Sequence, residues 1–352
     1  MADALPFETP PRSILIVMLS ALGDAVHVLP VVSALRRAWA GTRITWVIQP
    51  VPHALVRNHP AVDEFIVFQR RHGAATWRSY GELARVFEGR QFDLLLALQV
   101  YLKAGLIAAQ APARIKLGFD RARARDLNWL FTTHRIAARP VGHVQDQYFE
   151  FLETLGVDPE PVTWGLSPTD EERAAQRAFF AELDRPACAF VVGTSKPAKN
   201  WEPEHYARVI DHVEEVSGLR ALIVGGPSAI ERAAAARIVG LVKRKPIVVL
   251  GNDVRRLVWQ LDGSALLVSP DTGPLHIARA LDVPVVGLYG YTNPKRYGPY
   301  RKYGELVVDG YAQHPGEDYP CSMEHREGGM RRVRVEEVIE RVELALTRYA
   351  RM

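Results

Sequence analysis

The feature of this sequence that most constrains its fold is a strand, turn, helix and strand pattern within residues 264–291. The apolar run 265–268 is too short for a helix and suits a buried strand. The turn 269–273 leads into Pro274, and proline suits the first helical position because that N–H has no intrahelical partner. A second apolar run, 284–289, predicts another strand. This βαβ unit requires a parallel sheet, and open α/β sheets bind ligands at the carboxyl ends of their strands.

The turn of this unit carries groups that suit an anion. Thr272, Gly273 and Leu275 would present their amide N–H groups at a helix N-terminus, where the helix dipole favours negative charge. His276, in the first helical turn, would donate a hydrogen bond to a phosphate. A structural alternative stays open, in which Asp271 caps the helix and His276 is a surface residue.

Short apolar runs alternate with helical or loop stretches along the rest of the chain. Further strands are predicted at 14–19, 43–48, 64–68, 93–98, 187–192, 220–224 and 247–250. Helices are predicted at 30–39, 169–183 and 335–349. This alternation predicts an α/β fold with parallel sheets covered on both faces. A length of 352 residues favours two domains, and the stretch 155–168, which contains glycine and proline, is the expected linker.

The turns after the first strand of each predicted domain differ in chemistry. Ser20 to Asp24 reads SALGD, which is not a GxGxxG fingerprint, so a dinucleotide cofactor is not expected. The turn 193–201 of the second domain contains two hydroxyl groups and two ammonium groups, from Thr194, Ser195, Lys196 and Lys199. These donors and charges suit a diphosphate, and the alternative is an exposed polar loop.

Three motifs together resemble glycosyltransferase family 9, the heptosyltransferases. They are ILIVMLSALGDAVHVLP at 14–30, the 193–201 turn with Lys199 and Trp201, and Asp-Thr-Gly-Pro-x-His-x-Ala at 271–278. The resemblance implies the GT-B class, an α/β architecture of two Rossmann-like domains facing across a cleft. It implies an acceptor-binding domain at 1–160, a donor-binding domain at 161–334 and a C-terminal helix, 335–352, that packs back on the first domain.

The resemblance also implies a reaction. A heptose would pass from ADP-heptose to an anionic, Kdo-lipid A-like acceptor of the lipopolysaccharide inner core. Asp24 would be the general base of an inverting, metal-independent transfer, and Lys199 would stabilise the leaving diphosphate. The implied donor-binding residues are Thr194, Ser195, Lys196, Glu231, Asp271, Thr272, Gly273 and His276. Glu231 would lie near the ribose, although a common relative has its acid two residues earlier, where this chain has Ala229.

The stretch 114–139 contains seven basic and two acidic residues with interleaved aromatic side chains. For most individual arginines a solvated surface position is the simpler interpretation, but the cluster as a whole suits a polyanion. The resemblance implies a role in acceptor binding, with Arg121 and Arg125 as candidates. Nucleic acid is not an expected partner, because no established nucleic-acid motif surrounds this stretch.

Composition limits the remaining classes. With 48% hydrophobic residues the chain can build full cores, and it has no apolar run long enough to span a bilayer. The N-terminus is unlike a signal peptide, so we expect a cytoplasmic protein, with peripheral contact at the inner face of the inner membrane. No cofactor or metal is expected, since His314, Cys321 and His325 match no strong metal-site template.

Two alternatives remain open at this point. The same scaffold could transfer another sugar or use another acceptor, or the chain could bind a nucleotide sugar without turnover. Asp24 argues against mere binding, because binding needs no base in the opposite domain.

Overall fold

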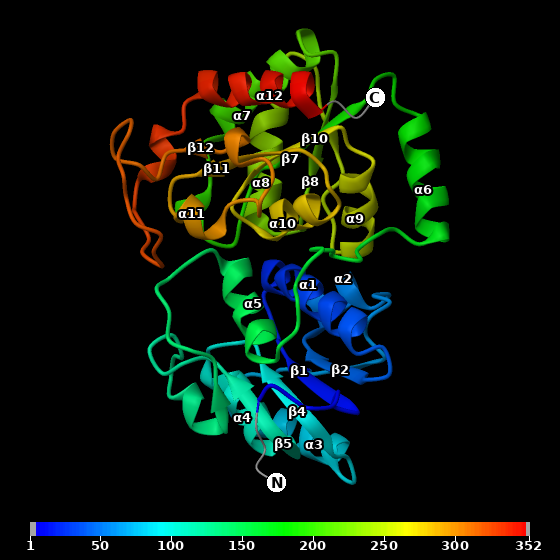
Figure 1. Ribbon diagram of the computed structural model, residues 1–352. Coiled ribbons are helices and arrows are strands. Elements are labelled where there is room, and N and C mark those ends of the chain that lie inside the picture. Colours follow the sequence, from blue (N-terminus) through cyan, green and yellow to red (C-terminus); the bar gives the residue numbers. More distant parts are fainter. Residues whose placement is uncertain (1–4, 350–352) are drawn as a thin grey trace. The chain divides into compact units, whose positions relative to one another are not determined.

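The computed structural model describes residues 5–349 and divides the chain into two compact units (Figure 1). The first unit comprises Met1–Pro140 and Val144–Leu166, and the second comprises Val141–His143 and Ser167–Met352. The chain passes from one unit to the other at 166/167, inside the stretch expected to be a linker. Residues 141–143 also belong to the second unit, although the residues on both sides of them belong to the first. Both units are parallel α/β domains, which confirms the expected fold class.

The first unit contains six strands and five α-helices among its described residues. The strands are β1 (Ser13–Val17), β2 (Arg43–Ile48), β3 (Glu64–Val67), β4 (Phe92–Ala97), β5 (Ala113–Gly118) and β6 (His134–Arg135). The helices are α1 (Leu22–Ala38), α2 (Pro50–Val56), α3 (Thr76–Phe87), α4 (Leu102–Gln110) and α5 (Val144–Thr154), with 3₁₀ turns η1 (Gly73–Ala75) and η2 (Asn128–Phe131). All strand pairs of this sheet are parallel.

The strand order of the first sheet is β3-β2-β1-β4-β5-β6, the doubly wound Rossmann order. Strand β1 lies at its centre, with Ile14 paired to both Ile44 and Leu94. Alternate residues of β1 point to opposite faces, and Leu15 and Val17 enter a core shared with α3 and α4. Helix α1 contacts both α2 and α5. The loops that follow β1 and β4 run in opposite directions at the carboxyl edge of the sheet, which is where open α/β sheets bind ligands.

Two elements of the first unit differ from the sequence prediction. Helix α1 begins at Leu22, eight residues before the predicted start, and Pro30 lies inside it rather than at its first turn. Strand β5 lies within the stretch treated as a basic surface cluster. Its buried residues Ile115 and Leu117 alternate with Arg114 and Lys116. This is the period-two pattern of a strand, which sequence analysis interpreted only as a cluster of positive charge.

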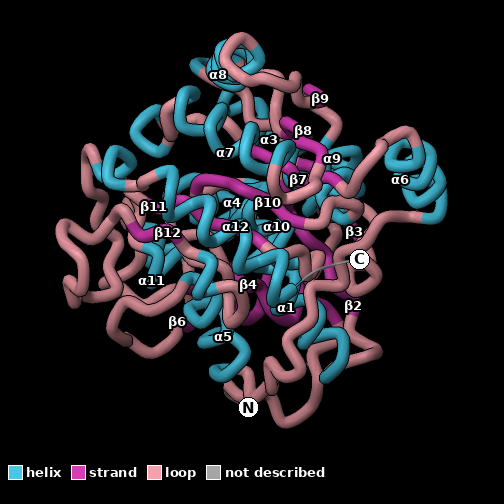
Figure 2. The backbone as a smooth tube through the Cα atoms, turned by 90° about the horizontal axis from the view of Figure 1, so that it is seen from above, coloured by secondary structure: helices cyan, strands magenta, loops and turns pink. Residues whose placement is uncertain are grey.

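The second unit repeats the same plan among its described residues. Its strands are β7 (Ala187–Val191), β8 (Arg220–Val224), β9 (Ile247–Val248), β10 (Leu266–Pro270), β11 (Val285–Tyr289) and β12 (Val308–Asp309). Its helices are α6 (Asp170–Ala181), α7 (Pro203–Glu215), α8 (Ala229–Val239), α9 (Val254–Asp262), α10 (Gly273–Ala280), α11 (Pro294–Tyr297) and α12 (Val335–Tyr349), with 3₁₀ turns η3 (Pro197–Lys199), η4 (Gly304–Leu306) and η5 (Gly329–Arg332). The strand order is β12-β11-β10-β7-β8-β9, again a Rossmann order, and Figure 2 shows β8, β7, β10, β11 and β12 following one another.

Helix α12 packs on the second unit. It contacts α7, β10, β11 and β12, and it buries Val335, Val338 and Val342. The predicted bounds 335–349 agree with the structure, and the contact with the first domain that the resemblance implied stays a prediction. An amphipathic pattern specifies that one helix face is buried, but it carries no information on which surface buries it.

Candidate functional site

In the second unit, the strand order reverses between β7 and β10. The chain runs from β7 outward to β8 and β9, and from β10 in the opposite direction to β11 and β12. The loops that leave the carboxyl ends of β7 and β10 therefore diverge around a crevice, which is where open α/β sheets hold ligands. The motifs at 193–201 and 271–276 occupy these two loops.

A buried ion pair joins the two loops. Lys199, at the end of η3, donates from Nζ to the Asp271 carboxylate at 2.6 Å and to the Asp271 carbonyl oxygen at 3.1 Å. The Lys199 side chain is 18% exposed and that of Asp271 is 8% exposed. The ammonium group is thus fixed at the switch point by a partner 72 residues away in sequence, and the Lys199 side chain is only partly buried.

The Asp271 carboxylate binds side chains from three segments. Besides Lys199, it accepts a hydrogen bond from the Thr292 hydroxyl at 2.7 Å and lies 3.4 Å from Nε2 of His276. Burial acts to raise the pKa of Asp271, but the hydrogen bond from His276 and the charges of Lys199 and His276 outweigh it and hold that pKa far below its usual value. Asp271 is therefore an ionised anchor that precedes the N-cap Thr272.

The N-terminus of α10 differs in two respects from the predicted anion site. The amide of Leu275 donates to the carbonyl oxygen of Thr272 at 3.0 Å, so it is used inside the turn. His276 is buried against Asp271 rather than pointing outward, because its ring closes the ion-pair cluster. Thr272 and Gly273 are half-buried at the start of the helix, as an anion-binding turn requires.

The turn after β7 is shaped by Thr194. Its amide donates to Oδ1 of Asn200 at 2.8 Å, and its hydroxyl donates to the carbonyl oxygen of Lys196 at 2.8 Å. These bonds bury Thr194 and leave Ser195 and Lys196 exposed at the tip of the turn. Ser195 and Lys196 are thereby presented to solvent beside Lys199, with a hydroxyl and an ammonium group toward any ligand at this edge.

A pair of aromatic rings that the sequence did not indicate lies beside these lysines. Tyr291 and His325 stack with ring centroids 4.6 Å apart, and the Lys196 ammonium lies 5.8 Å from the Tyr291 centroid. Burial lowers the pKa of His325, and the charges of Lys196 and Lys199 lower it further. Sequence analysis considered His325 only as a metal ligand, because a separation of 34 residues from Tyr291 leaves no local signal of the stack.

Glu231 has a structural role that the sequence did not predict. As the third residue of α8, it forms a capping box with Ser228 and accepts the amide of Gly226 at 2.7 Å. A Cβ on Gly225 would lie 2.6 Å from Oε1 of Glu231, so the glycines after β8 make room for this carboxylate. Its contact with a ribose stays a prediction.

In the first unit, Asp24 lies at the corresponding switch point, between β1 and β4. It is the third residue of α1, and its Oδ2 accepts the amide of Ala21 at 2.8 Å. Lys103 of α4 donates to the Ser20 hydroxyl at 2.8 Å. Burial and the charge of Arg70 lower the pKa of Lys103, and the charge of Asp24 opposes that shift. A carboxylate and two cations therefore share this edge of the first sheet.

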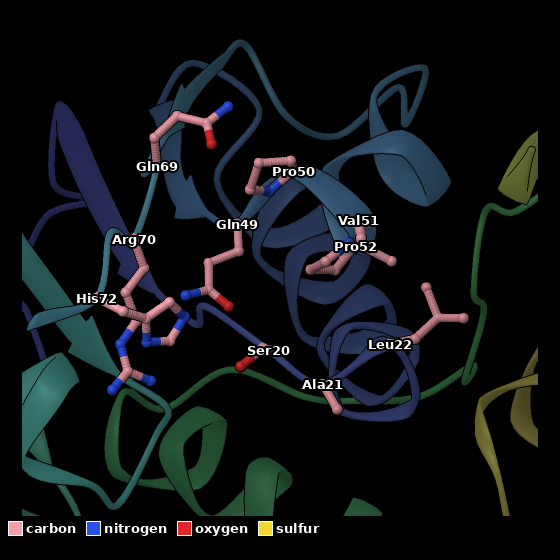
Figure 3. A pocket seen from close by; sticks show the side chains of 10 residues that line it. All are labelled: Ser20, Ala21, Leu22, Gln49, Pro50, Val51, Pro52, Gln69, Arg70 and His72. Carbon is pink, nitrogen blue, oxygen red and sulfur yellow. The ribbon is translucent and has the colours of Figure 1, made fainter. Parts of the chain in front are cut away.

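A pocket of about 420 Å³ adjoins this edge. It is lined by Ser20, Ala21, Leu22, Gln49, Pro50, Val51, Pro52, Gln69, Arg70 and His72. Figure 3 shows Ser20, Gln49, Arg70 and His72 gathered at one side and Val51 with Leu22 at the other. The pocket thus has a polar, cationic side next to an apolar side. Sequence analysis singled out Ser20 as part of the turn but missed Arg70 and His72, which lie in a loop without a motif.

The basic stretch 114–139 separates into structural and exposed residues. Arg123 is buried in an ion pair with Asp120 and in a second one, at 2.7 Å, with Glu150. Arg121 and Arg125 are exposed, and the Arg121 guanidinium lies 4.6 Å from the ring centroid of Trp129. The two candidate arginines are therefore placed where a ligand in solution can reach them.

Two features are absent from the described residues, a metal-ligand cluster and a membrane-spanning helix. Between residues 5 and 349, no three His, Cys, Asp or Glu side chains gather as ligands of a metal ion. None of the helices in this range combines the length and apolarity that crossing a bilayer requires.

Two Rossmann-type units, each with polar loops at its switch point, are the architecture of the GT-B class of glycosyltransferases. The model of glycosyltransferase family 9 (heptosyltransferase) matches residues 80–326, and the chain belongs to this family. The chain is therefore a glycosyltransferase, as the three sequence motifs predicted.

Relatives and solved structures agree with this assignment. The chain is 29% identical over 303 residues to the lipopolysaccharide core heptosyltransferase OpsX of Haemophilus influenzae, covering 86% of this chain and 85% of the relative. It is 30% identical to lipopolysaccharide heptosyltransferase 1 of Pseudomonas aeruginosa, covering 88% and 85%. A family 9 structure from Veillonella parvula superposes with a TM-score of 0.81 at 25% identity, covering 98% and 99%. The heptosyltransferase WaaC of Escherichia coli with ADP, at 23% identity, shares the fold with a TM-score of 0.72, covering 95% and 99%.

Proposed function

We propose that this protein transfers a heptose from ADP-heptose to an anionic inner-core acceptor of lipopolysaccharide, by inversion and without a metal ion. The observation that carries the proposal is the Lys199–Asp271 pair at the switch point of the second unit, with Lys196 beside it. The names of the relatives at 29% and 30% identity, both lipopolysaccharide heptosyltransferases, support the choice of sugar and acceptor.

The donor diphosphate would bind between the loops after β7 and β10. The ammonium group of Lys199 would contact its oxygens, while Asp271 keeps that group in position. Ser195, Lys196 and the amides of Thr272 and Gly273 would supply further donors. These groups neutralise the negative charge that develops on ADP as it leaves, so no divalent cation is needed in this mechanism.

The acceptor hydroxyl would react at the edge of the first unit. Asp24 would take its proton while the oxygen forms a bond to the anomeric carbon of the heptose. The bond from that carbon to the ADP oxygen breaks at the same time, and ADP leaves with the electron pair. Attack from the face opposite ADP inverts the anomeric configuration. The polar side of the adjoining pocket, with Arg70, suits a carboxylate of a Kdo sugar.

The acceptor also bears on the location of the protein. Because this acceptor is a lipid built on the inner membrane, we place the protein in the cytoplasm with peripheral contact at that membrane. Arg121 and Arg125, both exposed on the first unit, would add positive charge toward the acceptor.

The test is a transfer assay with a panel of nucleotide sugars and Kdo-lipid A, read by mass spectrometry. We expect a product one heptose heavier with ADP-heptose and little or none with the other donors. A product from another nucleotide sugar alone would replace the proposed donor. Donor binding in calorimetry without any product would instead identify a nucleotide-sugar binding protein.

A further inference from the structure

Large apolar side chains are exposed on one part of the first unit. Trp77 is 72% exposed, Leu127 60% and Leu130 55%. Tyr101 and Leu102, at the start of α4, are also exposed. These five residues, called the apolar face below, come from the start of α3, the start of α4 and the segment around η2. In Figure 1, α3 and α4 lie at the lower end of the first unit.

Direct contacts connect the three segments of the apolar face. Helix α4 contacts both α3 and η2. The ring of Trp77 lies 6.3 Å from that of Tyr80, whose hydroxyl donates to the Lys103 carbonyl oxygen at 3.2 Å. On the other side, Asn128 donates to the carbonyl oxygen of Tyr101 at 2.8 Å. The three segments that carry the exposed side chains are therefore adjacent in the fold, although they span residues 77–130.

Leu127 sits in a conformation that its residue type disfavours. Its φ is +59°, in the left-handed region where glycine and asparagine are common and a branched apolar side chain is not. The Leu127 side chain is mostly exposed, so burial does not offset the cost of this conformation. A contact outside the chain would account for an apolar residue at this position.

Exposed charges adjoin the apolar face in sequence, three of them positive and one, Asp126, negative. Arg78 follows Trp77 on α3, and Arg121 and Arg125 precede Leu127; all three arginines are exposed. Aromatic and leucine side chains bordered by arginines are the composition that favours the interface of an anionic bilayer. A second copy of the same surface is a poor partner, because it would bring like charges together.

The apolar face also borders the candidate acceptor site. Lys103 follows Leu102 on α4, and its ammonium group donates to the hydroxyl of Ser20, next to the turn that holds Asp24. A bilayer on this face would therefore lie close to the carboxylate proposed to activate the acceptor.

We propose that the apolar face docks on an anionic phospholipid bilayer and inserts Trp77, Leu127 and Leu130 at the boundary between headgroups and acyl chains. The glycan of a lipid-linked acceptor then reaches the Asp24 edge while its acyl chains stay in the membrane; this last step rests on the proposed function. Arginines of the rim bind lipid phosphates.

The experiment measures partitioning of the full chain onto vesicles by sedimentation. Vesicles of phosphatidylglycerol and phosphatidylethanolamine are compared with vesicles of phosphatidylcholine alone. The test variant combines Trp77→Ser, Leu127→Asn and Leu130→Ser, where asparagine suits the left-handed backbone. The matched control combines three substitutions of exposed apolar residues on the second unit, Val216→Ser, Leu241→Ser and Val248→Ser.

We expect wild type and control to bind the anionic vesicles and the test variant to bind at least about tenfold more weakly. The test variant should keep its turnover of a deacylated, water-soluble acceptor and lose turnover of the vesicle-embedded one. Equal vesicle binding by all three proteins would overturn the proposal. The proposal would also be overturned if wild type failed to bind vesicles and instead formed a dimer that the test variant cannot form. Normal vesicle partitioning without turnover of either acceptor would support the docking surface while removing the proposed function.

Discussion

The Asp271 carboxylate shows how a single residue can determine the geometry of the proposed donor site. Its partners Lys199, His276 and Thr292 come from three separate segments, so ionised Asp271 holds together the loops after β7, β10 and β11. Removing the charge would leave a mostly buried ammonium group without its counter-ion, which typically costs about 3–5 kcal/mol. Asp271 is thus a positioning residue for Lys199. The pH dependence of unfolding measures the contribution of its charge to stability, independently of turnover.

The first prediction concerns Asp271→Asn. Because the pKa of Asp271 is lowered in the folded protein, its ionisation stabilises the fold above the unfolded pKa of about 3.9, and this stabilisation is lost as the pH falls below it. The variant should be less stable than wild type at pH 7, and the difference should shrink toward about pH 3. Urea unfolding across this range measures it. Asp318→Asn, at a side chain 98% exposed, is the control and should match wild type throughout. A difference that stays constant with pH would contradict the assignment.

The second prediction concerns Asp24→Asn. Asparagine can still accept the Ala21 amide, so the helix start should remain intact. If Asp24 is the general base, kcat should fall by roughly 10²–10⁴ while the melting temperature and donor affinity stay near those of wild type. Asp24→Ala, which removes both functions, should lose about 1 kcal/mol of stability in addition. Near-normal kcat in Asp24→Asn would remove this residue from the mechanism.

At the scale of elements, a close backbone approach fixes the loop that carries His325. Gly290, directly after β11, lies against Gly329 of η5, and a Cβ on Gly290 would be 2.2 Å from the amide nitrogen of Met330. The two glycines let the chain between β12 and α12 return to β11. The Tyr291–His325 stack and the bridge between Thr292 and His325 follow from this return.

The third prediction concerns this approach. Gly290→Ala should lower stability by about 1–3 kcal/mol, the usual cost of overpacking. It should also weaken ADP binding, because a shift of Tyr291 would displace Lys196, which lies 5.8 Å from its ring centroid and is proposed to contact the diphosphate. Gly304→Ala is the matched control, since a Cβ there would meet no heavy atom within 4 Å in the described chain. Thermal unfolding and calorimetry with ADP give the two readouts. Equal melting temperatures for both variants would show that the backbone can move apart without cost.

Most strands could be predicted from the sequence, because short β-branched runs between turns need only local information. Helix α1 was predicted too short, since Pro30 is a common helix start but here lies in a helix that packs tightly enough to tolerate it. The positions of the loops proposed to bind the donor could be predicted, because their motifs directly follow strands β7 and β10. The Lys199–Asp271 pair, the Arg70 side of the pocket and the His325 stack could not be, because they depend on contacts between distant segments.

At the scale of the whole molecule, the reaction needs positive charge for a leaving diphosphate. The fourth prediction is that turnover survives excess EDTA, because Lys196, Lys199 and the N-terminus of α10 supply that charge. Initial rates with and without the chelator measure it, and Lys199→Ala should be strongly impaired under both conditions. A loss of activity on chelation that magnesium or manganese restores would contradict the metal-independent mechanism.

The last prediction concerns the anionic acceptor and the exposed basic residues of the first unit. Charges in solvent are screened within about 8 Å at physiological ionic strength, so acceptor binding through Arg121 and Arg125 should weaken as salt rises. Arg121→Ala and Arg125→Ala should each raise the acceptor KM more than the donor KM and flatten its salt dependence. Arg208→Ala makes the same charge change on the second unit, where the side chain is 61% exposed, and should leave the acceptor KM unchanged. A water-soluble acceptor keeps membrane binding out of the measurement. Equal increases in both KM values would assign the two arginines to the fold of the first unit rather than to the acceptor.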